Sequence, residues 1–352
     1  MQITHSKPFA DEEDINAVSE VIKSQKHATG DTVAKFENAM AELIGQKYAK
    51  ATSSGTTALH ISLLALGIKK EDEVIIPSYV CGDVLNAVNH ANAKSVLVDI
   101  GSDSFNISFE KISPLITKKT KAIILPHLFG IPADIEDILK LADTKNIAVI
   151  EDCAQSLGAK FPDGKFTGSK AIISIFSFYA TKTISTGQGG MILTSSKELK
   201  KRIDDLMTYD KKPVYTTGYN YSMTDIQASL GLSQLKKLDM FISRRREIAK
   251  KYSQAFKSPS IKLTDYPKGS YPYRYIILFK DKNSRDLFDK KLKENGINSS
   301  EPVFYPLHRY LRLKGFENTN DVYDRILSIP IYPALSDEEV EDITDCLKNI
   351  KV

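Results

Sequence analysis

The sequence predicts an α/β protein with a mostly parallel sheet sandwiched by helices and a smaller C-terminal α/β domain. Two observations predict this class. Short apolar runs alternate with helical patterns over the first two thirds of the chain, and this texture changes near Ser222. A chain of 352 residues is also long enough for two domains. We therefore expect a large domain of residues 1–235 and a smaller one of residues 236–352.

Two amphipathic helices are expected at the start of the chain. Apolar residues recur at helical spacing after the acidic segment Asp11–Asp14, and again before Gly45, a residue type that favours helix C-terminal caps. Strands and helices then alternate. The expected strands are Val74–Ile76, Val96–Val98, Ala122–Leu125, Ala148–Ile150 and Ile172–Phe176, and the expected helices include Ala58–Leu66 and Ile135–Ala142.

The second domain is expected to begin with a long helical stretch, Met223–Phe256, that joins it to the first. A strand-like run, Tyr273–Phe279, and a helix near Arg285–Asn295 follow. The final helix begins with Ser336 and Glu339 at the spacing of a capping box.

Composition excludes several classes of protein. With 48 basic and 44 acidic residues, the chain gives no reason to expect a nucleic-acid or membrane partner. Arg244–Arg246 is read as a solvated helix face, with a nucleotide-phosphate contact as the alternative. The three cysteines form no Cys-x-x-Cys pair, so no metal site is expected and a reducing cytoplasm fits best. No signal peptide or apolar stretch of about 18 residues is found, which predicts a soluble protein.

The segment Ser53–Thr57 precedes a predicted helix. Small residues at a helix N-terminus let backbone N–H groups approach an anion, and the helix dipole favours a phosphate there. Taken alone, the segment favours a simple helix N-cap over a phosphate site.

Two further segments follow apolar strands. Asp152 comes after Ala148–Ile150, and ligands of open α/β sheets bind outside the carboxyl ends of the strands. Lys182 lies in a small-residue loop before Gly187–Gly190, where a lysine can form a Schiff base if its pKa falls from about 10.4. Considered singly, Asp152 is equally typical of a turn cap, and Lys182 is typical of a surface lysine.

The order and spacing of these segments resemble the DegT/DnrJ/EryC1/StrS family of sugar aminotransferases, which are fold-type I enzymes that depend on pyridoxal 5'-phosphate (PLP). The resemblance covers nearly the whole chain. Its matching segments are SSGTTALH at residue 53, VIIPSY at 74, VLVDI at 96, PHLFGIPADI at 126, VIEDCAQSLGA at 149, FSFYATK at 176, GQGGMI at 187, GYNYSMTDIQASLGLSQL at 218, RRREIAKKY at 244, YPLH at 305 and ILSIPIYPALS at 326.

The resemblance implies a role for each matching residue. Lys182 matches the catalytic lysine that holds PLP as a Schiff base, and Asp152 matches the acid bonded to the ring nitrogen. Asn220 matches a residue that reaches the phosphate from the other subunit, which implies a homodimer with shared active sites. The other matches contact the ring hydroxyl (Gln155) or the phosphate (Ser54, Gly55, Thr56 and Ser177).

The chain departs from the family pattern at several positions. Cys81 stands where many relatives place an aromatic that stacks on the cofactor ring, and Tyr79 lies two residues earlier, so we expect one of the two to contact the ring. Gln188 replaces a frequent Glu and Ser222 a frequent Arg. Lys182 is retained where relatives that remove a sugar hydroxyl carry His, which favours transamination.

The resemblance therefore implies a transaminase that moves an amino group from an amino acid, expected to be L-glutamate, to a keto group of a nucleotide-linked sugar. The course would be ping-pong through pyridoxamine, in amino-sugar, surface-polysaccharide or glycoside biosynthesis. A sugar dehydratase, a cyclitol aminotransferase and a non-catalytic PLP-binding regulator stay open as alternatives. His308, in YPLH, is either near the substrate or a packed structural residue.

Overall fold

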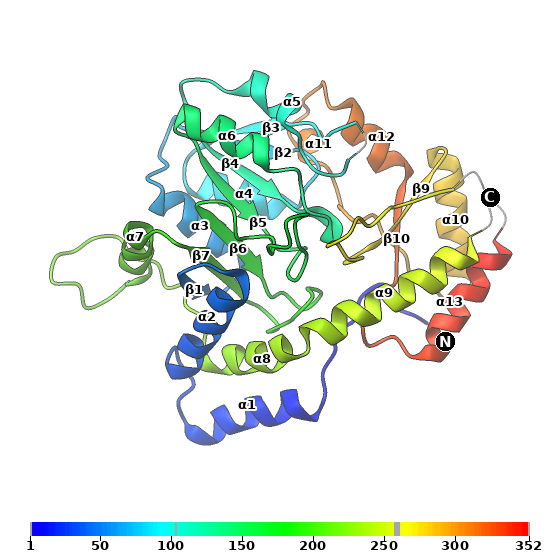
Figure 1. The fold of residues 1–352 in the computed structure, drawn as a ribbon, viewed down its shortest axis with the longest axis horizontal. Helices are drawn as coiled ribbons and strands as arrows, with labels where there is room; N and C mark the ends of the chain where they lie inside the picture. The colour runs from blue at the N-terminus through cyan, green and yellow to red at the C-terminus, as the bar shows by residue number, and fades with distance from the viewer. Residues whose placement is uncertain (1, 103, 257–260, 351–352) are drawn as a thin grey trace.

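A seven-stranded sheet lies at the centre of the larger part of the molecule (Figure 1). In the computed structural model, which describes residues 2–102, 104–256 and 261–350, the strand order is β1-β7-β6-β5-β4-β2-β3. β7 runs antiparallel to both neighbours and the other neighbouring pairs are parallel, so the mostly parallel sheet is confirmed. The strands are β1 (Tyr48–Thr52), β2 (Glu73–Pro77), β3 (Lys94–Val98), β4 (Thr120–Pro126), β5 (Ala148–Asp152), β6 (Ile173–Ser177) and β7 (Gly190–Thr194).

Helices cover both faces of this sheet. Adjacent residues of β2 enter different cores: Val74 and Ile76 pack on the side of α3, and Ile75 packs on the side of α6. A strand that is covered on both faces requires this alternation. Around the sheet lie α1 (Glu12–Ser24), α2 (Asp31–Ile44), α3 (Gly55–Ala65), α4 (Gly82–His90), α5 (Phe109–Ile112), α6 (Glu136–Lys145) and α7 (Lys197–Met207), with the 3-10 turns Ser113–Leu115 and Leu128–Gly130.

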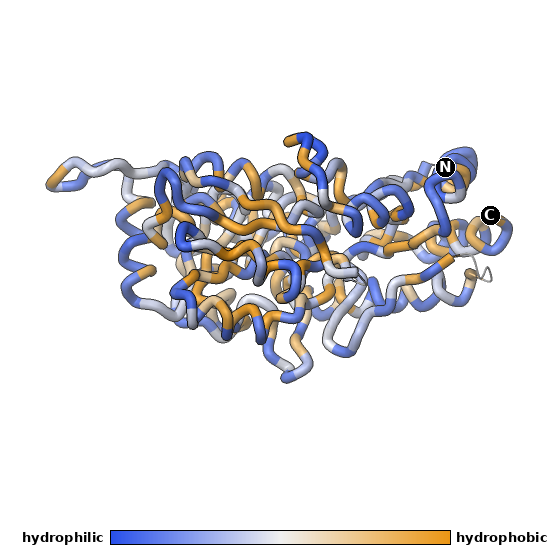
Figure 2. Tube along the Cα trace, turned by 90° about the horizontal axis from the view of Figure 1, so that it is seen from above, coloured by the Kyte–Doolittle hydropathy of each residue, from blue (hydrophilic) through white to orange (hydrophobic). Residues whose placement is uncertain are grey.

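The helix α3 is apolar nearly all round, and seven of its residues are buried. A helix of this kind is stable only inside a core. It packs against α4, α7, β6 and β7, so its N-terminus is held close to the ends of the central strands. Figure 2 shows the same organisation along the whole chain, with hydrophobic segments inside and hydrophilic segments mostly at the periphery.

The single long helix expected over Met223–Phe256 is wrong, because the structure has two helices, α8 (Asp225–Lys236) and α9 (Leu238–Ala255). They meet at Lys237, whose backbone (φ −97°, ψ 3°) leaves the helical range. The Lys237 ammonium lies 3.0 Å from a carboxylate oxygen of Asp14, a buried residue in the first turn of α1. This pairing with α1 accompanies the break and gives it a physical reason.

The second α/β unit contains a three-stranded antiparallel sheet of order β10-β9-β8. Its core also takes in Ile3, which bridges to Ile297, so the start of the chain lies against this unit. The capping box expected at Ser336 and Glu339 is confirmed. The elements are β8 (Ile261–Leu263), β9 (Tyr275–Phe279), α10 (Lys282–Glu294), α11 (Leu307–Tyr310), α12 (Glu317–Arg325), β10 (Ile326–Ile329) and α13 (Asp337–Asn349).

The domain boundary at residue 235 stays a prediction. Among the described residues, no helix has both the length and the apolar composition needed to cross a bilayer.

Candidate active site

A cavity of about 190 Å³ lies at the carboxyl ends of β5 and β6, where open α/β sheets bind ligands. Segments far apart in the sequence meet there: the N-termini of α3 and α4, the end of β5 and the loop after β6. The cavity therefore brings together most of the residues that the sequence singles out. Its walls are formed by Ser54, Gly55, Thr56, Leu59, Cys81, Asp83, Val84, Asp152, Ala154, Ile175, Ser177, Tyr179, Lys182 and Gln188.

Asp152 is the last residue of β5, and only 6% of it is exposed. One carboxylate oxygen accepts a hydrogen bond from Ala154 N (3.0 Å), so the turn-cap interpretation is confirmed. No other hydrogen bond to this carboxylate is present among the described residues. Burial raises the pKa of Asp152, against the opposing effects of the Ala154 N–H and the Lys182 ammonium. A cationic N–H donor inside the cavity would therefore satisfy a group that the protein leaves partly unpaired.

Ser54 is the N-cap of α3. Its Oγ accepts from Thr57 N (3.1 Å), and Thr57 Oγ1 accepts from Ser54 N (3.0 Å), which forms a reciprocal capping box. The N-cap interpretation is thus confirmed. It is compatible with an anion site, because the cap leaves the N-terminal N–H groups of Gly55 and Thr56 beside the cavity.

Two glycines allow the close packing around this helix N-terminus. A Cβ atom on Gly55 would lie 3.0 Å from Cβ of Ser177, at the end of β6. A Cβ atom on Gly190, the first residue of β7, would lie 2.2 Å from the backbone oxygen of Ser54. The start of α3 therefore packs directly against the end of β6 and the start of β7, and this packing fixes the position of its N–H groups.

Lys182 lies in the loop between β6 and β7 and is partly buried. Its backbone N–H donates to Tyr179 O (2.8 Å). Its Nζ atom forms no salt bridge with a described residue, and lies 5.8 Å from the centre of the Tyr273 ring. Lys182 also borders a second, narrower cavity of about 20 Å³ on the side of the smaller domain. The Lys182 side chain therefore lies between the main cavity and this second cavity.

The structure separates the two candidates for contact with a cofactor ring. Cys81, the N-cap of α4, lines the main cavity with an exposed side chain. Tyr79 is completely buried in another core, where its ring makes an edge contact with Phe129 at 6.3 Å between centroids. Tyr79 therefore does not reach the cavity in this structure.

Two residues that the resemblance assigns to the cofactor lie outside the cavity walls. The Gln155 side-chain oxygen accepts from Phe129 N (3.1 Å) instead of facing the cavity. Asn220 is exposed on the surface of this chain. The two positions that depart from the family pattern, Gln188 and Ser222, lie in different places. Gln188 lines the cavity, whereas Ser222 forms a β-bridge with Thr52 at the end of β1.

His308 is a packed structural residue in this structure. Its Nδ1 lies 2.6 Å from Ser78 Oγ, and its Nε2 lies 3.2 Å from Asn320 Oδ1. The ring stacks on Phe316 with centroids 4.7 Å apart. Both ring nitrogens therefore have partners, and the side chain lines neither cavity.

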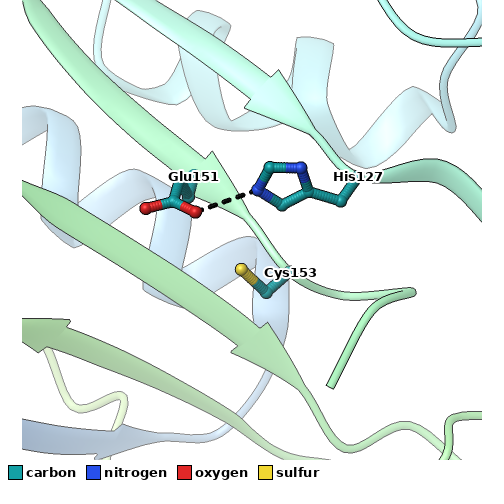
Figure 3. A group of neighbouring side chains, drawn as sticks. All are labelled: His127, Glu151 and Cys153. Atoms are coloured by element: carbon teal, nitrogen blue, oxygen red, sulfur yellow. Dashed lines mark hydrogen bonds and ion pairs between the residues drawn. The ribbon is translucent and has the colours of Figure 1, made fainter. Parts of the chain in front are cut away.

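Behind Asp152, the other face of β5 carries a buried polar cluster (Figure 3). His127 Nδ1 accepts from Ala133 N (3.0 Å), so the hydrogen-bond network places the ring proton on Nε2, which donates to Glu151 (3.0 Å). The Glu151 carboxylate also accepts three backbone N–H bonds of 2.7–2.8 Å from residues 168, 170 and 171. Burial alone would raise the pKa of Glu151, but these donors hold it below its ordinary value.

This cluster has the spacing of a metal site, since ligand atoms of His127, Glu151 and Cys153 lie within 4.8 Å of one another. Both ring nitrogens of His127 and both carboxylate oxygens of Glu151 are nevertheless already engaged in hydrogen bonds within the protein. Burial also raises the pKa of the Cys153 thiol well above its ordinary value, which disfavours the thiolate that a metal requires. We interpret the cluster as a support that holds the end of β5, and so Asp152, in position.

Sequence reasoning missed six residues of the cavity wall: Leu59, Asp83, Val84, Ala154, Ile175 and Tyr179. Leu59 and Val84 read as ordinary helical core positions. Asp83 lies in the first turn of α4, where an acidic residue is expected for helix stability alone, so it carries no distinguishing signal. Tyr179 lies within the FSFYATK segment, but its spacing alone does not place it at the cavity.

Comparison with known proteins gives concordant results. The DegT/DnrJ/EryC1/StrS aminotransferase family model matches residues 8–348. An uncharacterised protein, MJ1066, of Methanocaldococcus jannaschii is 38% identical, covering 98% of this chain and 96% of its own. GDP-perosamine synthase of Escherichia coli O157:H7 is also 38% identical, covering 88% of each chain.

Solved structures extend the likeness to three dimensions. Spr1654 of Streptococcus pneumoniae is a proposed sugar aminotransferase. Its PLP form superposes with a TM-score of 0.92 at 26% identity, covering 99% of this chain and 98% of that one. PseC of Helicobacter pylori, an aminotransferase of pseudoaminic acid biosynthesis, gives a TM-score of 0.92 at 27% identity with the same coverage.

Proposed function

The chain belongs to the DegT/DnrJ/EryC1/StrS aminotransferase family and is a PLP-dependent aminotransferase, and on this premise we propose that it transfers an amino group from L-glutamate to a keto group of a nucleotide-linked sugar. The observation that carries the proposal is the cavity in which Lys182, Asp152 and the N-terminus of α3 meet. We expect the enzyme to work in the cytoplasm, in the biosynthesis of amino sugars for polysaccharides or glycosides.

The residues present fit PLP. The cavity offers a lysine amine, a buried carboxylate without a second partner in the described part of the chain, and a helix N-terminus packed so closely that a Cβ atom on Gly190 would fill the space of the Ser54 carbonyl. These are the groups that an aldehyde, a protonated ring nitrogen and a phosphate require, respectively. We propose that Lys182 binds the aldehyde and that Asp152 binds the ring nitrogen. The phosphate would be bound by Ser54, Gly55, Thr56 and Ser177.

PLP, when bound, supplies an electron sink that stabilises negative charge on the carbon that loses a proton. The amine of Lys182 would hold the cofactor covalently. Once a substrate amine displaces it, the free Nζ of Lys182 would take a proton from the substrate carbon and deliver it to the cofactor carbon that carried the aldehyde. Asp152 would keep the ring nitrogen protonated. The α3 N-terminus and the Ser177 hydroxyl would fix the phosphate, and with it the orientation of the reacting bond.

The proposed sugar substrate rests on the relatives. GDP-perosamine synthase is named for its product, and PseC is an aminotransferase of pseudoaminic acid biosynthesis; both are similar to this chain over most of its length. Retention of Lys182 supports transamination over dehydration. Cys81, rather than an aromatic residue, would contact the cofactor ring, because Tyr79 is buried elsewhere. Gln155 would need to turn away from Phe129 N to reach the ring hydroxyl.

We also propose that the enzyme acts as a homodimer. Val214 and Tyr215 are 73% and 90% exposed, in the segment after α7 that projects from the fold in Figure 1. On α1, Ile15 and Ile22 are 54% and 50% exposed and lie seven positions apart, on one face of the helix. A second copy of the chain would cover such apolar side chains, and it would bring the exposed Asn220 near a partner's cavity.

The test is the half-reaction with the amino donor. L-glutamate added to the PLP-bound enzyme should convert its visible absorption to that of the pyridoxamine form and release one 2-oxoglutarate per site. A panel of nucleotide-linked keto sugars, with keto cyclitols as the comparison set, should then restore the original spectrum only for the true acceptor. Failure with every amino donor would reject transamination and favour a regulatory role. Water release from a sugar without a donor would favour dehydration.

A further inference from the structure

The second cavity beside Lys182 is surrounded by positive charge. Its walls include Lys7, Lys182, Arg245 and Arg274, together with His5, and no described residue of these walls is Asp or Glu. Lys182, Arg245 and Arg274 form no salt bridge with any residue in the described ranges 2–102, 104–256 and 261–350. This is unusual, because buried or partly buried cations are normally paired with a carboxylate.

Arg245 is the most confined of these cations. It is only 4% exposed, and its guanidinium donates to two backbone oxygens, those of Tyr273 (3.0 Å) and Ile331. Its Nε atom is buried and has no hydrogen-bond partner among the residues that the structure describes. Nε of Arg274 is likewise buried and unpartnered, while its Nη1 donates to the His5 ring at 2.9 Å.

The same positive charges lower the pKa values of two neighbouring side chains, His5 and Tyr273. Burial and the adjacent Arg274 lower the pKa of His5 to about 3, so His5 is neutral at physiological pH. Burial alone would raise the pKa of Tyr273, but Lys182, Arg274 and Arg245 bring it below its ordinary value. Asp14, which contacts the wall residue Gln234 at 2.7 Å, does not relieve this charge, because it is paired with Lys237.

We propose that this cavity is a subsite for a small anion, and that Arg274 and Arg245 bind it through their guanidinium groups. The inference rests on the proposed function for the identity of the ligand. Two sources share the chemistry: the carboxylate of the amino donor and a phosphate of the nucleotide-linked sugar.

The geometry favours the donor carboxylate. The cavity of about 20 Å³ has room for a group about the size of one water molecule or slightly larger, not for a nucleoside. Lys182 lines both this cavity and the main one, so an anion held here lies next to the reacting amine. The α-carboxylate of an amino acid is one bond from the carbon that reacts, whereas the sugar ring separates a nucleotide phosphate from the keto carbon.

The experiment is calorimetric titration of the PLP-bound enzyme with succinate, a dicarboxylate that cannot transaminate, and separately with GDP and UDP. The variants are Arg274→Gln, the charge-retaining Arg274→Lys, and Arg202→Gln as the matched control. Arg202 lies on α7 and pairs with the exposed Glu198, so its loss removes the same charge from another surface. Circular dichroism and the PLP absorption band check that each variant is folded and loaded.

Arg274→Gln should weaken succinate binding, and raise the glutamate concentration that half-saturates the half-reaction, by about tenfold or more, with Arg274→Lys intermediate. GDP and UDP binding should change less than twofold, and Arg202→Gln should match the wild type throughout. Weakening confined to GDP or UDP would support the anion subsite but assign it to the sugar phosphate. Unchanged affinity for all three probes, or no binding by the wild type, would overturn the subsite. Absence of the wild-type half-reaction would instead reject the proposed function, so the two failures are distinguishable.

Discussion

Gly190→Ala tests whether the contact between β7 and the start of α3 positions the cofactor. The added Cβ atom would lie 2.2 Å from Ser54 O, 2.4 Å from Ser54 C and 2.7 Å from Gly55 N. All three contacts are with backbone, so no side-chain rotation relieves them. Gly190 does not have a positive φ, which means that the substitution acts through the collision alone.

The magnitude follows from these distances. To restore an ordinary contact, the Ser54 carbonyl must move by about 1 Å, and the N–H groups of Gly55 and Thr56 must move with it. Overpacking of this kind costs about 1–3 kcal/mol. If the cost falls on the PLP-bound arrangement of the loop, the affinity for PLP falls by about 5- to 150-fold.

The assay is titration of cofactor-free enzyme with PLP, followed by visible absorption. Gly82→Ala is the matched control: Gly82 is also the first residue of its element, borders the same region next to Cys81, and has open space where its Cβ would lie. The control should bind PLP as the wild type does. Wild-type affinity for PLP in folded Gly190→Ala would refute the claim that this packing sets the phosphate site.

Two further predictions concern the carboxylates of β5. Asp152→Asn should raise the thermal midpoint of the cofactor-free enzyme at pH 7, because burial raises the pKa of Asp152 and its ionised form therefore costs stability. The same substitution should slow the glutamate half-reaction about tenfold or more. A faster half-reaction would contradict this role. Glu151→Gln should lower the unfolding free energy at pH 7 by about 3–5 kcal/mol, since an amide cannot accept all four donors, with exposed Glu198→Gln as the control. Because the folded pKa of Glu151 lies below 4.5, its stabilisation is present above that pH and lost as the pH falls further, so a Glu151→Gln deficit that stayed constant down to pH 3 would count against this account.

Much of the sheet could be predicted from sequence because its central strands are continuous apolar runs. The predicted strand Ala148–Ile150 became β5, and Asp152 lies at its end as expected. The flanking strands gave weaker signals. Tyr48–Thr52, with alternating Lys and small residues, reads as neither a clear strand nor a helix, so β1 and its antiparallel pairing with β7 were missed.

The main cavity could be predicted in outline because its residues sit at element ends, where segment order has structural meaning. Ser54 and Ser177 are examples. Side-chain direction could not be predicted in the same way. Tyr79 and Cys81 are two residues apart, but Tyr79 packs in a hydrophobic core with Phe129, whereas Cys81 is the N-cap residue of α4.

The second cavity as a whole had no sequence signal, although two of its residues were singled out for other reasons. Lys182 was assigned to the main cavity, and the solvated helix face expected for Arg244–Arg246 is wrong for Arg245, which is only 4% exposed. His5, Lys182 and Arg274 come from the N-terminal segment, the β6–β7 loop and the bend immediately before β9. No spacing rule connects such positions. Only tertiary packing shows that their charges converge without a carboxylate among them, and the same packing shows that Lys237 breaks what reads as one helix.

The central claim is that Lys182 holds the cofactor in the cavity at the ends of β5 and β6. Borohydride reduction of the PLP-bound enzyme, followed by peptide mass spectrometry, tests it most directly. We predict that the visible absorption band disappears and that the cofactor mass is found on the peptide containing Lys182, with no label in Lys182→Ala. A label on another lysine, or a folded protein that takes up no PLP, would contradict the account.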